Sequence, residues 1–319
     1  MLISTLFFAS CSPALQSQNE LAPGSAEPDD TQSSTISPTN QPDPTELPPS
    51  TISGEITDTT YSSEGILIIK DIGDFSYDAK NIITVRDDLF NNGNFSVFDI
   101  LVHLDNTNQI AMEYYFDETM NTHIIETINQ LPNWWYVAYY DGGWPENNIF
   151  RMDHFPYKDN MFITVFQIDE EDLNKNYAVF KEEVARKKTN KGKTIIPTVL
   201  INGQQRNIEF NNITIEAHDL RTDVFVPGSI TAMDVIMTLG DQDLISYDLQ
   251  WYESIGSAGI VKDYFVNRIN DDTAFNRCGF VYEAGAEENF LGRGNHIHIP
   301  PDTRLLNSPE YVQFFWICI

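Results

Sequence analysis

Ser96-Val-Phe-Asp99-Ile-Leu-Val-His-Leu104 and Thr231-Ala-Met-Asp234-Val-Ile-Met-Thr-Leu239 are the two stretches that decide the fold. In each, Ser or Thr stands three residues before an acid, and apolar residues follow at helical spacing. A hydroxyl at the N-cap with an acid three residues later is typical of a capping box, here with Asp in place of the usual Glu. Each stretch therefore predicts a short amphipathic helix, and the helix dipole explains the two acids better than catalysis does.

Similar residues surround both helices in the same order, which indicates an internal repeat. The copies are expected to open with short strands at 82–87 and 213–216. After the helices, the matched residues are Ile110 and Ile245, Glu113 and Asp248, Phe116 and Trp251, Ile128-Asn129 and Ile269-Asn270, 134–137 and 278–281, and His154-Phe-Pro156 and His298-Ile-Pro300. Apolar strands at 161–166 and 311–316 close the copies. The order of strand, helix and several strands predicts an α+β fold with a helix packed on one face of a mixed sheet.

Three stretches of the first copy point to a known module. They are the helix at 96–104, the aromatic run Trp134-Trp-Tyr-Val-Ala-Tyr-Tyr-Asp-Gly-Gly-Trp144 and the closing Pro156-Tyr-Lys-Asp159-Asn-Met-Phe-Ile163. Together they resemble the β-grasp module found at the C-terminal end of transcobalamin and, in single or tandem copies, on bacterial surface proteins. The resemblance implies two β-grasp-like modules, at 61–170 and 212–319. It also implies a corrinoid or similar planar molecule as one ligand class, although this chain offers no counterpart of the helical domain that supplies much of the site in that family.

The segment 171–211 is expected to connect the modules. Its basic cluster at 175–193, which includes Arg186-Lys187-Lys188, fits a solvated helix over 176–188 or one arm of a hairpin. The cluster either offsets local acidity or contacts the acidic N-terminal region. Asn202-Gly203 between two β-type runs predicts a hairpin with a type I′ turn. Pro197 lacks an N–H and predicts an edge strand.

The N-terminus ends an apolar run with Ala9-Ser10-Cys11, which resembles the lipobox of a bacterial lipoprotein signal. The resemblance implies a signal at 1–11, lipid on Cys11 and export to the bacterial envelope, facing the surface or the periplasm. Residues 12–60 contain no Lys or Arg and are rich in Ser, Thr and Pro, so they predict a disordered acidic tether. An ordinary cleaved signal and a cytosolic protein are the alternatives. The apolar run is shorter than the roughly 20 residues that span a bilayer, so lipid would be the membrane attachment.

Charge and cysteine content limit the partners. A formal net charge of −28 argues against electrostatic binding of nucleic acid or an anionic lipid surface. With Cys11 lipidated, Cys278 and Cys318 remain as one disulfide or as two buried free thiols.

The aromatic run supplies the candidate ligand site. Along a strand, Trp135 and Tyr139 would face one way and Trp134, Tyr136 and Tyr140 the other, with Trp144 in the following turn. One helix covers only one face of a sheet, so the other face would bind a ligand or pack against the second repeat.

Other site motifs are weak. His296 and His298 face the same side of an expected strand and are weak candidates for a metal, and no cofactor is expected. No nucleophile elbow, P-loop or HExxH motif is present, which favours a non-enzymatic protein. The first hypothesis is a lipid-anchored surface protein that binds a small ligand or a surface protein. A structural or adhesive envelope spacer and a metal-dependent hydrolase centred on the two histidines are the alternatives.

Overall fold

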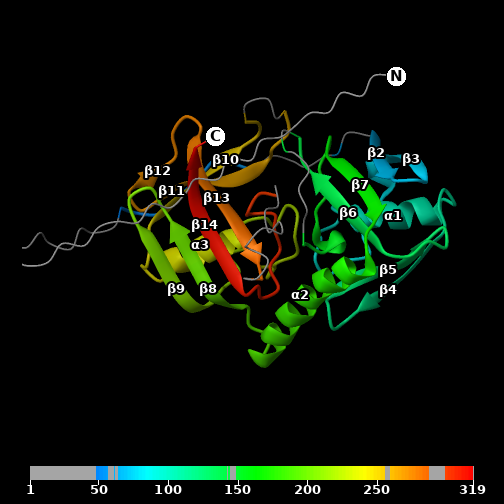
Figure 1. Cartoon of the computed structure of the whole chain (residues 1–319). Helices are drawn as coiled ribbons and strands as arrows, with labels where there is room; N and C mark the ends of the chain where they lie inside the picture. The colour runs from blue at the N-terminus through cyan, green and yellow to red at the C-terminus, as the bar shows by residue number, and fades with distance from the viewer. Residues whose placement is uncertain are drawn as a thin grey trace, which may run out of the picture. The chain divides into compact units, whose positions relative to one another are not determined.

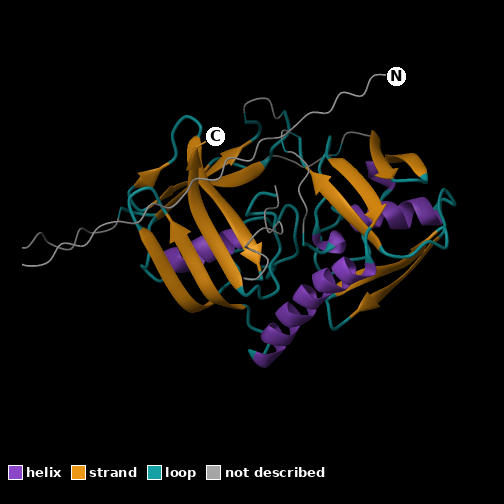
Figure 2. Ribbon diagram, viewed as in Figure 1, coloured by secondary structure: helices purple, strands orange, loops and turns teal. Residues whose placement is uncertain are grey.

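Two mixed β-sheets with the same order of strands organise the chain (Figures 1 and 2). The computed structural model describes residues 48–56, 61, 64–141, 143, 149–255, 259–286 and 299–318. The strands are β1 (Thr51–Ser53), β2 (Glu64–Ile69), β3 (Gly73–Asp78), β4 (Met112–Asp117), β5 (Thr122–Ile128), β6 (Trp134–Tyr139), β7 (Phe162–Gln167), β8 (Ile195–Asn202), β9 (Asn207–Thr214), β10 (Tyr247–Tyr252), β11 (Asp263–Ile269), β12 (Asp272–Thr273), β13 (Cys278–Gly285) and β14 (Tyr311–Cys318). The helices are α1 (Val97–Asn106), α2 (Glu170–Thr189) and α3 (Ala232–Asp241), with 3-10 turns η1 (Ala79–Asn81) and η2 (Met152–His154).

The two sheets have matching topology. The first has the order β3-β2-β7-β6 and the second the order β9-β8-β14-β13. In each sheet the two central strands are parallel and the outer strands are antiparallel to their neighbours. A helix and a second hairpin come between the two halves of each sheet in sequence: α1 with β4 and β5, and α3 with β10 and β11. We call β2 to β7 with α1 module 1, and β8 to β14 with α3 module 2. The chain is α+β, as its sequence predicts.

Both predicted helices form, and their acids also fasten the preceding loop. The Asp99 carboxylate accepts the N–H of Ser96 at 2.7 Å and the N–H of Val85 at 2.7 Å. In module 2 the Asp234 carboxylate accepts the N–H of Thr231 at 2.6 Å and the N–H of His218 at 2.8 Å. The acids therefore have a structural role that extends beyond the helix dipole.

The residues that follow the helices match as the sequence predicts. The β4–β5 ladder shifts register after Glu113, and the β10–β11 ladder shifts after Asp248. Beyond each ladder stands an asparagine with positive φ, Asn129 at 50° and Asn270 at 53°. Asn tolerates this left-handed conformation better than most residues. We call a residue of module 1 and a residue of module 2 equivalent when they occupy the same structural position in the two modules.

Later matches are out of register. Tyr136 donates its hydroxyl to the Phe150 carbonyl at 2.9 Å, and Tyr282 donates to the Ile299 carbonyl at 2.6 Å. These bonds make Tyr136 equivalent to Tyr282, so the match of 134–137 with 278–281 was wrong by two residues. Counting onward from Phe150 and Ile299 makes Asp153 equivalent to Asp302. The match of His154 with His298 was therefore also wrong, because the loops before these positions differ in length.

The expected opening strands are also corrected. Residues 82–87 form no strand, and of 213–216 only the first two residues belong to β9. The modules instead open with the hairpins β2–β3 and β8–β9. In the loop after β3, the backbone N–H of Val85 is taken by Asp99 rather than by a neighbouring strand.

The hairpin assigned to the connector belongs to module 2. β8 pairs with β14, which makes β8 an interior strand and the edge prediction from Pro197 wrong. The proline is tolerated because pairing with β14 begins only at Thr198. The ladder with β9 is likewise interrupted opposite Pro197, near Asn212, which has φ 58°. The turn is wider than predicted: Asn202 pairs with Asn207, and neither Asn202 nor Gly203 has positive φ.

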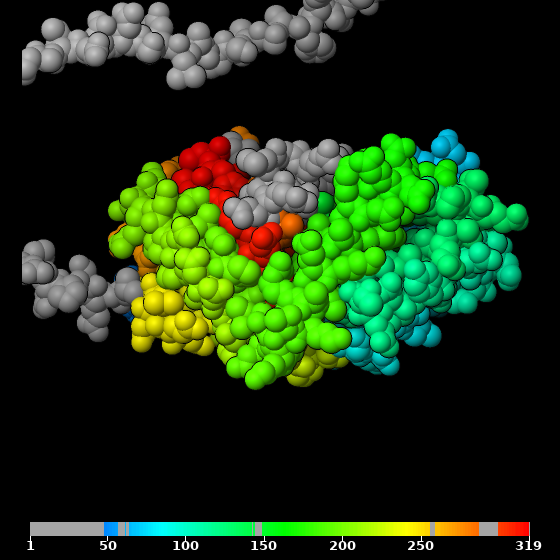
Figure 3. Space-filling model, turned by 60° about the horizontal axis from the view of Figure 1, so that its bottom comes forward, coloured from blue at the N-terminus to red at the C-terminus, as the bar shows by residue number. Residues whose placement is uncertain are grey.

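Two segments outside the two matching sheets also take defined positions. The basic cluster lies in and just after α2, so the helical alternative for 176–188 is confirmed. Figure 3 shows the outward side of α2, in green, on the molecular surface. β1 lies within the expected tether 12–60 and pairs parallel with β10. The tether is therefore not structureless up to residue 60.

Candidate functional site

The aromatic strand β6 is part of the core. Trp134, Trp135, Tyr136 and Tyr140 are buried. Tyr139 is partly exposed and stacks on Phe162, with ring centroids 5.0 Å apart. Trp144 lies outside the described residues. The expectation of an open aromatic binding face is therefore corrected: four of the six candidate side chains cannot reach a ligand without unfolding the core.

Helix α2 provides the cover that the sequence analysis missed. The ring of Trp135 lies 6.2 Å from the rings of both Tyr177 and Phe180. Leu173, four residues before Tyr177, belongs to the same core. The spacing i, i+4, i+7 was a readable signal for an apolar stripe on an otherwise charged helix. One sheet is thus covered by helices on both faces, α1 on one and α2 on part of the other.

The phenols of β6 have structural partners. Tyr136 donates to the Phe150 carbonyl, and Tyr140 donates to the Pro156 carbonyl at 2.9 Å. Burial raises the pKa of both hydroxyls well above the usual value, so they remain neutral donors. These side chains fix loops to the strand.

The histidine candidates give no metal site that can be described. His296 and His298 lie outside the described residues. Within the described ranges, no group of three or more His, Cys, Asp or Glu side chains is arranged to hold a metal ion. His154 is buried beside Arg86, and burial holds the pKa of its ring well below the usual value.

The cysteines resolve one open alternative. Cys278 and Cys318 form a disulfide between directly opposed residues of β13 and β14. Cys11 lies outside the described residues. None of the helices in the described part of the chain is both long and apolar enough to cross a membrane.

Two buried arginines, which the sequence analysis missed, hold equivalent loops. Arg86 forms a two-pronged ion pair with Asp88 at 2.7 and 2.9 Å and reaches Asp153 at 2.7 Å. The equivalent contacts in module 2 are from Arg221 to Asp223, at 2.9 Å for both prongs, and to Asp302 at 2.7 Å. The shared sequence signal is Arg-x-Asp. A planar guanidinium suits such bidentate pairing, and removing one partner of a buried pair costs about 3–5 kcal/mol.

The two arginine loops meet each other at the junction of the modules. The Asn91 N–H donates to the Val224 carbonyl at 2.9 Å, and the Val226 N–H donates to the Leu89 carbonyl at 3.0 Å. Because Leu89 is equivalent to Val224 and Asn91 to Val226, exchanging the modules exchanges these two bonds. The contact is therefore two-fold symmetric, like the isologous interface of a homodimer, but both of its halves belong to one chain. Phe90 and Phe225, with Val224 and Leu305, form a small apolar core there.

A buried ion cluster adds a second contact across the junction. Lys158 of module 1 pairs with Asp263 of module 2 and donates to the Val261 carbonyl at 2.8 Å. Arg221 reaches the other oxygen of Asp263 at 2.9 Å. Burial raises the pKa of the Asp263 carboxyl to about 7, against the attraction of Lys158, while Asp302 nearby adds to the rise. Burial also lowers the pKa of the Lys158 ammonium.

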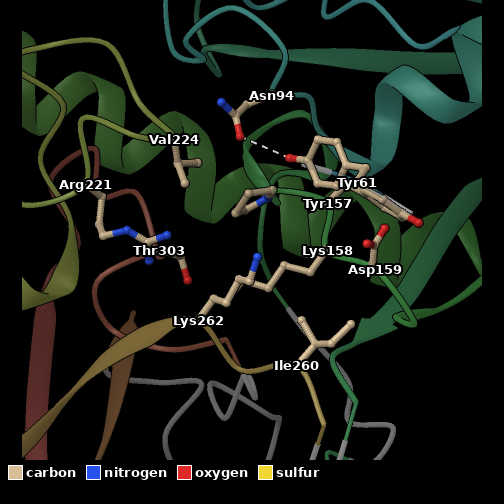
Figure 4. Close-up of a pocket in the computed structure, with 11 residues that line it drawn as sticks. Tyr61, Asn94, Tyr157, Lys158, Asp159, Arg221, Val224, Ile260, Lys262 and Thr303 are labelled. Atoms are coloured by element: carbon tan, nitrogen blue, oxygen red, sulfur yellow. Dashed lines mark hydrogen bonds between the residues drawn. The ribbon is translucent and has the colours of Figure 1, made fainter. Parts of the chain in front are cut away.

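A pocket opens beside this cluster (Figure 4). Its volume is about 460 Å³, including the part open to solvent. Figure 4 shows Tyr61 and Asn94, joined by a 3.0 Å hydrogen bond, across the pocket from Arg221 and Thr303. The remaining lining residues are Pro156, Tyr157, Lys158, Asp159, Val224, Ile260 and Lys262. Aromatic and charged groups are both present in the lining. We call this hollow the junction pocket; its enclosed part has a volume of about 40 Å³, which is room for a few water molecules.

Comparison of the chain with protein-family models, curated proteins and solved structures gave no significant match.

Proposed function

We propose that this chain is a non-enzymatic, lipid-anchored protein of the cell envelope that presents two β-grasp modules as one rigid binding body. The junction of the arginine loops is the observation that carries the proposal. The modules of this chain share paired backbones, an apolar contact between Phe90 and Phe225 and a buried ion pair between Lys158 and Asp263. Modules that moved independently on a flexible linker would lack such contacts. A fixed pair of modules suits recognition or spacing outside the membrane.

The β-grasp assignment is supported by topology. Each module has a first hairpin, a helix, and a last strand that returns to lie parallel beside the first, as in the β-grasp arrangement of the transcobalamin module. We also propose that the two modules arose by duplication. Support comes from the shared ladder shifts, the asparagines Asn129 and Asn270, and the paired arginines Arg86 and Arg221.

The anchor is supported by composition. Ala9-Ser10-Cys11 after an apolar run, followed by a stretch without Lys or Arg, fits a lipid-bearing Cys11 and a spacer. Export agrees with the disulfide between Cys278 and Cys318, because disulfides persist in oxidising compartments.

Binding is assigned to the junction pocket and the sheet edges. The buried positions of Trp134, Tyr136 and Tyr140 remove the basis for a corrinoid bound on the β6 face, so the proposal includes no such ligand. A structural envelope spacer is the alternative, because the same rigid junction would serve a protein that only separates its partners.

Rigidity is tested by spin-label distances in the full chain carrying Cys11→Ser. Labels on Lys80→Cys in module 1 and Glu209→Cys in module 2 occupy exposed positions. One narrow distance distribution is expected, and it should broaden when Phe225→Ala weakens the junction. A broad distribution in the otherwise unaltered chain would refute the rigid body.

Anchoring is tested by labelling bacterial cells that express the chain with a fatty-acid analogue. The label is expected on the parent chain and lost in Cys11→Ser. Equal labelling of both, or labelling of neither, would refute the lipid anchor.

A further inference from the structure

Strand β1 is an added strand on the edge of module 2. Thr51 donates its hydroxyl to Asp248, and Arg268 donates to the Pro49 carbonyl at 2.9 Å. The register places Thr51, Ile52 and Ser53 opposite Asp248, Leu249 and Gln250. A segment from the N-terminal region thus pairs with backbone groups that an edge strand would otherwise leave open.

Module 1 has an equivalent edge in β4. Beside the shared ladder shift, both modules place a buried arginine over an aromatic ring of this strand. Arg86 lies over Phe116 and Arg221 lies over Trp251, each 5.2 Å from the ring centroid. β4 is therefore the counterpart of β10, strand for strand and residue for residue.

Among the described residues, no strand covers the outer edge of β4. In the described part of the chain β4 pairs with β5 alone, whereas β10 pairs with both β11 and β1. Phe116 is 42% exposed and its neighbour Tyr115 is 45% exposed, whereas the equivalent Trp251 is 6% exposed. Gly54 packs closely against Trp251: a Cβ added to Gly54 would lie 2.5 Å from the Trp251 Cβ. Figure 1 shows β4 as the outer strand of its pair.

The chain contains a second segment of the type that fills the equivalent edge. Ser34-Thr35-Ile36-Ser37 is identical to Ser50-Thr51-Ile52-Ser53, which includes the whole of β1. Pro38 follows it in place of Gly54. Proline has no N–H to donate and commonly ends a strand, so the repeat covers the three-residue strand and the serine before it.

We propose that the open edge of β4 accepts the 34–37 segment of a second copy of this chain as an added parallel strand. Transferring the β1 register places Thr35 opposite Glu113, Ile36 opposite Tyr114 and Ser37 opposite Tyr115. The added backbone hydrogen bonds supply affinity, and the strand covers part of the exposed Tyr115 and Phe116 rings.

Each copy then offers one donor segment and one acceptor edge. Such a contact is heterologous, so it joins copies head to tail instead of closing a two-fold dimer. The inference rests on the proposed function, because lipid anchors concentrate copies on one membrane and so increase a contact that free chains form at high concentration. The partner is therefore a neighbouring copy of the same chain.

Disulfide trapping tests the register. Chains with Cys11→Ser and either Ser37→Cys or Tyr115→Cys are mixed under mild oxidation, and the linked residues are read by mass spectrometry. A mixed dimer joined between positions 37 and 115 is expected. The matched control acceptor is Ile83→Cys, which is 83% exposed and lies outside β4. It should trap the donor poorly.

The other outcomes overturn the proposal. Equal trapping by both acceptors, or trapping by neither, removes β4 as the site. A chain carrying both Ser37→Cys and Tyr115→Cys that forms an internally bridged monomer in place of dimers assigns the segment to its own chain. Either result leaves the spin-label and fatty-acid tests intact, so failure here is distinguishable from failure of the proposed function.

Hydrogen exchange provides a test without cysteines. Exchange of the backbone N–H groups of β4 should slow as the concentration of the Cys11→Ser chain rises. Adding Ile36→Asp should remove this dependence, because a charge on the donor strand opposes pairing. Exchange that does not respond to concentration would contradict the proposal.

Discussion

Phe90 and Phe225 pack against each other with ring centroids 5.5 Å apart, and each stands four residues after the arginine that holds its loop. The chain thus brings two equivalent residues into contact with each other at the junction. Each buries its ring because the other covers it, and this mutual dependence determines how the two modules respond to mutation.

Phe90→Ala and Phe225→Ala should each lower the free energy of unfolding of the full chain by about 3–5 kcal/mol, measured by chemical denaturation. The double variant should lose less than the sum, because both changes remove the same contact. Phe275→Ala, at a residue that is 50% exposed, is the control and should cost far less. Strictly additive losses would show that the rings do not depend on each other.

Gly54→Ala should release β1 from β10. Gly54 has φ 93° and a Cβ would clash with Trp251, whereas Gly93 has φ 88° and a Cβ there meets nothing within 4 Å. Both substitutions carry the backbone cost of about 1 kcal/mol, so only the clash separates them. Hydrogen exchange at Ile52 and Ser53 should accelerate in Gly54→Ala and not in Gly93→Ala. Equal protection in the two variants would mean that β1 does not depend on its fit against Trp251.

His218 should make stability pH-dependent. Its ring nitrogens lie 3.0 Å from Asp234 and 3.0 Å from Asp241, and the hydrogen bond with Asp234 is the largest cause that raises the pKa of His218 above the usual value. The protonated ring is favoured in the folded state, so this contribution is complete below about pH 6.5 and is lost as pH rises through the higher folded pKa.

The matched variant is His218→Val, because the backbone N–H of His218 donates to Asp234 at 2.8 Å as that of Val85 donates to Asp99 in module 1. The stability difference between parent and variant should be larger at pH 6 than at pH 9, by about 1 kcal/mol or less. Parallel stability curves over that range would contradict the assignment.

Reduction of the Cys278–Cys318 disulfide should lower the free energy of unfolding by about 3–4 kcal/mol, because the bridge spans 40 residues of sequence. The measurement is denaturation with and without reductant. The chain with both cysteines replaced by serine should be insensitive to reductant, which separates the bridge from general effects. A parent chain that is equally insensitive would show that the bridge is not formed.

Features set by neighbouring residues could be predicted from the sequence. The capping boxes at Ser96 and Thr231 need only an acid three residues on, and the hairpin around Gly203 needs only two flanking β-type runs. The two helices and the hairpin form, and the turn of the hairpin is wider than predicted. The details that failed depend on distant chain: the pairing of β8 with β14 decides whether the strand of Pro197 is interior, and no local pattern contains that information.

The candidate site was missed for the same reason. Arg221 finds Asp263 and Asp302 at sequence separations of 42 and 81 residues, and Arg86 finds Asp153 at 67. Only the short-range Arg-x-Asp pairs could be seen in the sequence. The sequence predicted one uncovered face for the aromatic strand, because the cover that α2 supplies at Trp135 depends on how this helix folds back onto the sheet.

The position of β1 changes what the chain's connectivity means. Strand β1, which pairs with β10 of module 2, comes first in the chain. Module 1 follows it, and the chain then continues through α2 into the other strands of module 2. In covalent terms module 1 is an insertion within module 2, joined to it at both ends. A single cut in the basic stretch after α2 divides the chain into two polypeptides, and β1 remains on the fragment that carries module 1. The pairing of β1 with β10 and the junction contacts, which are non-covalent, then hold the fragments together.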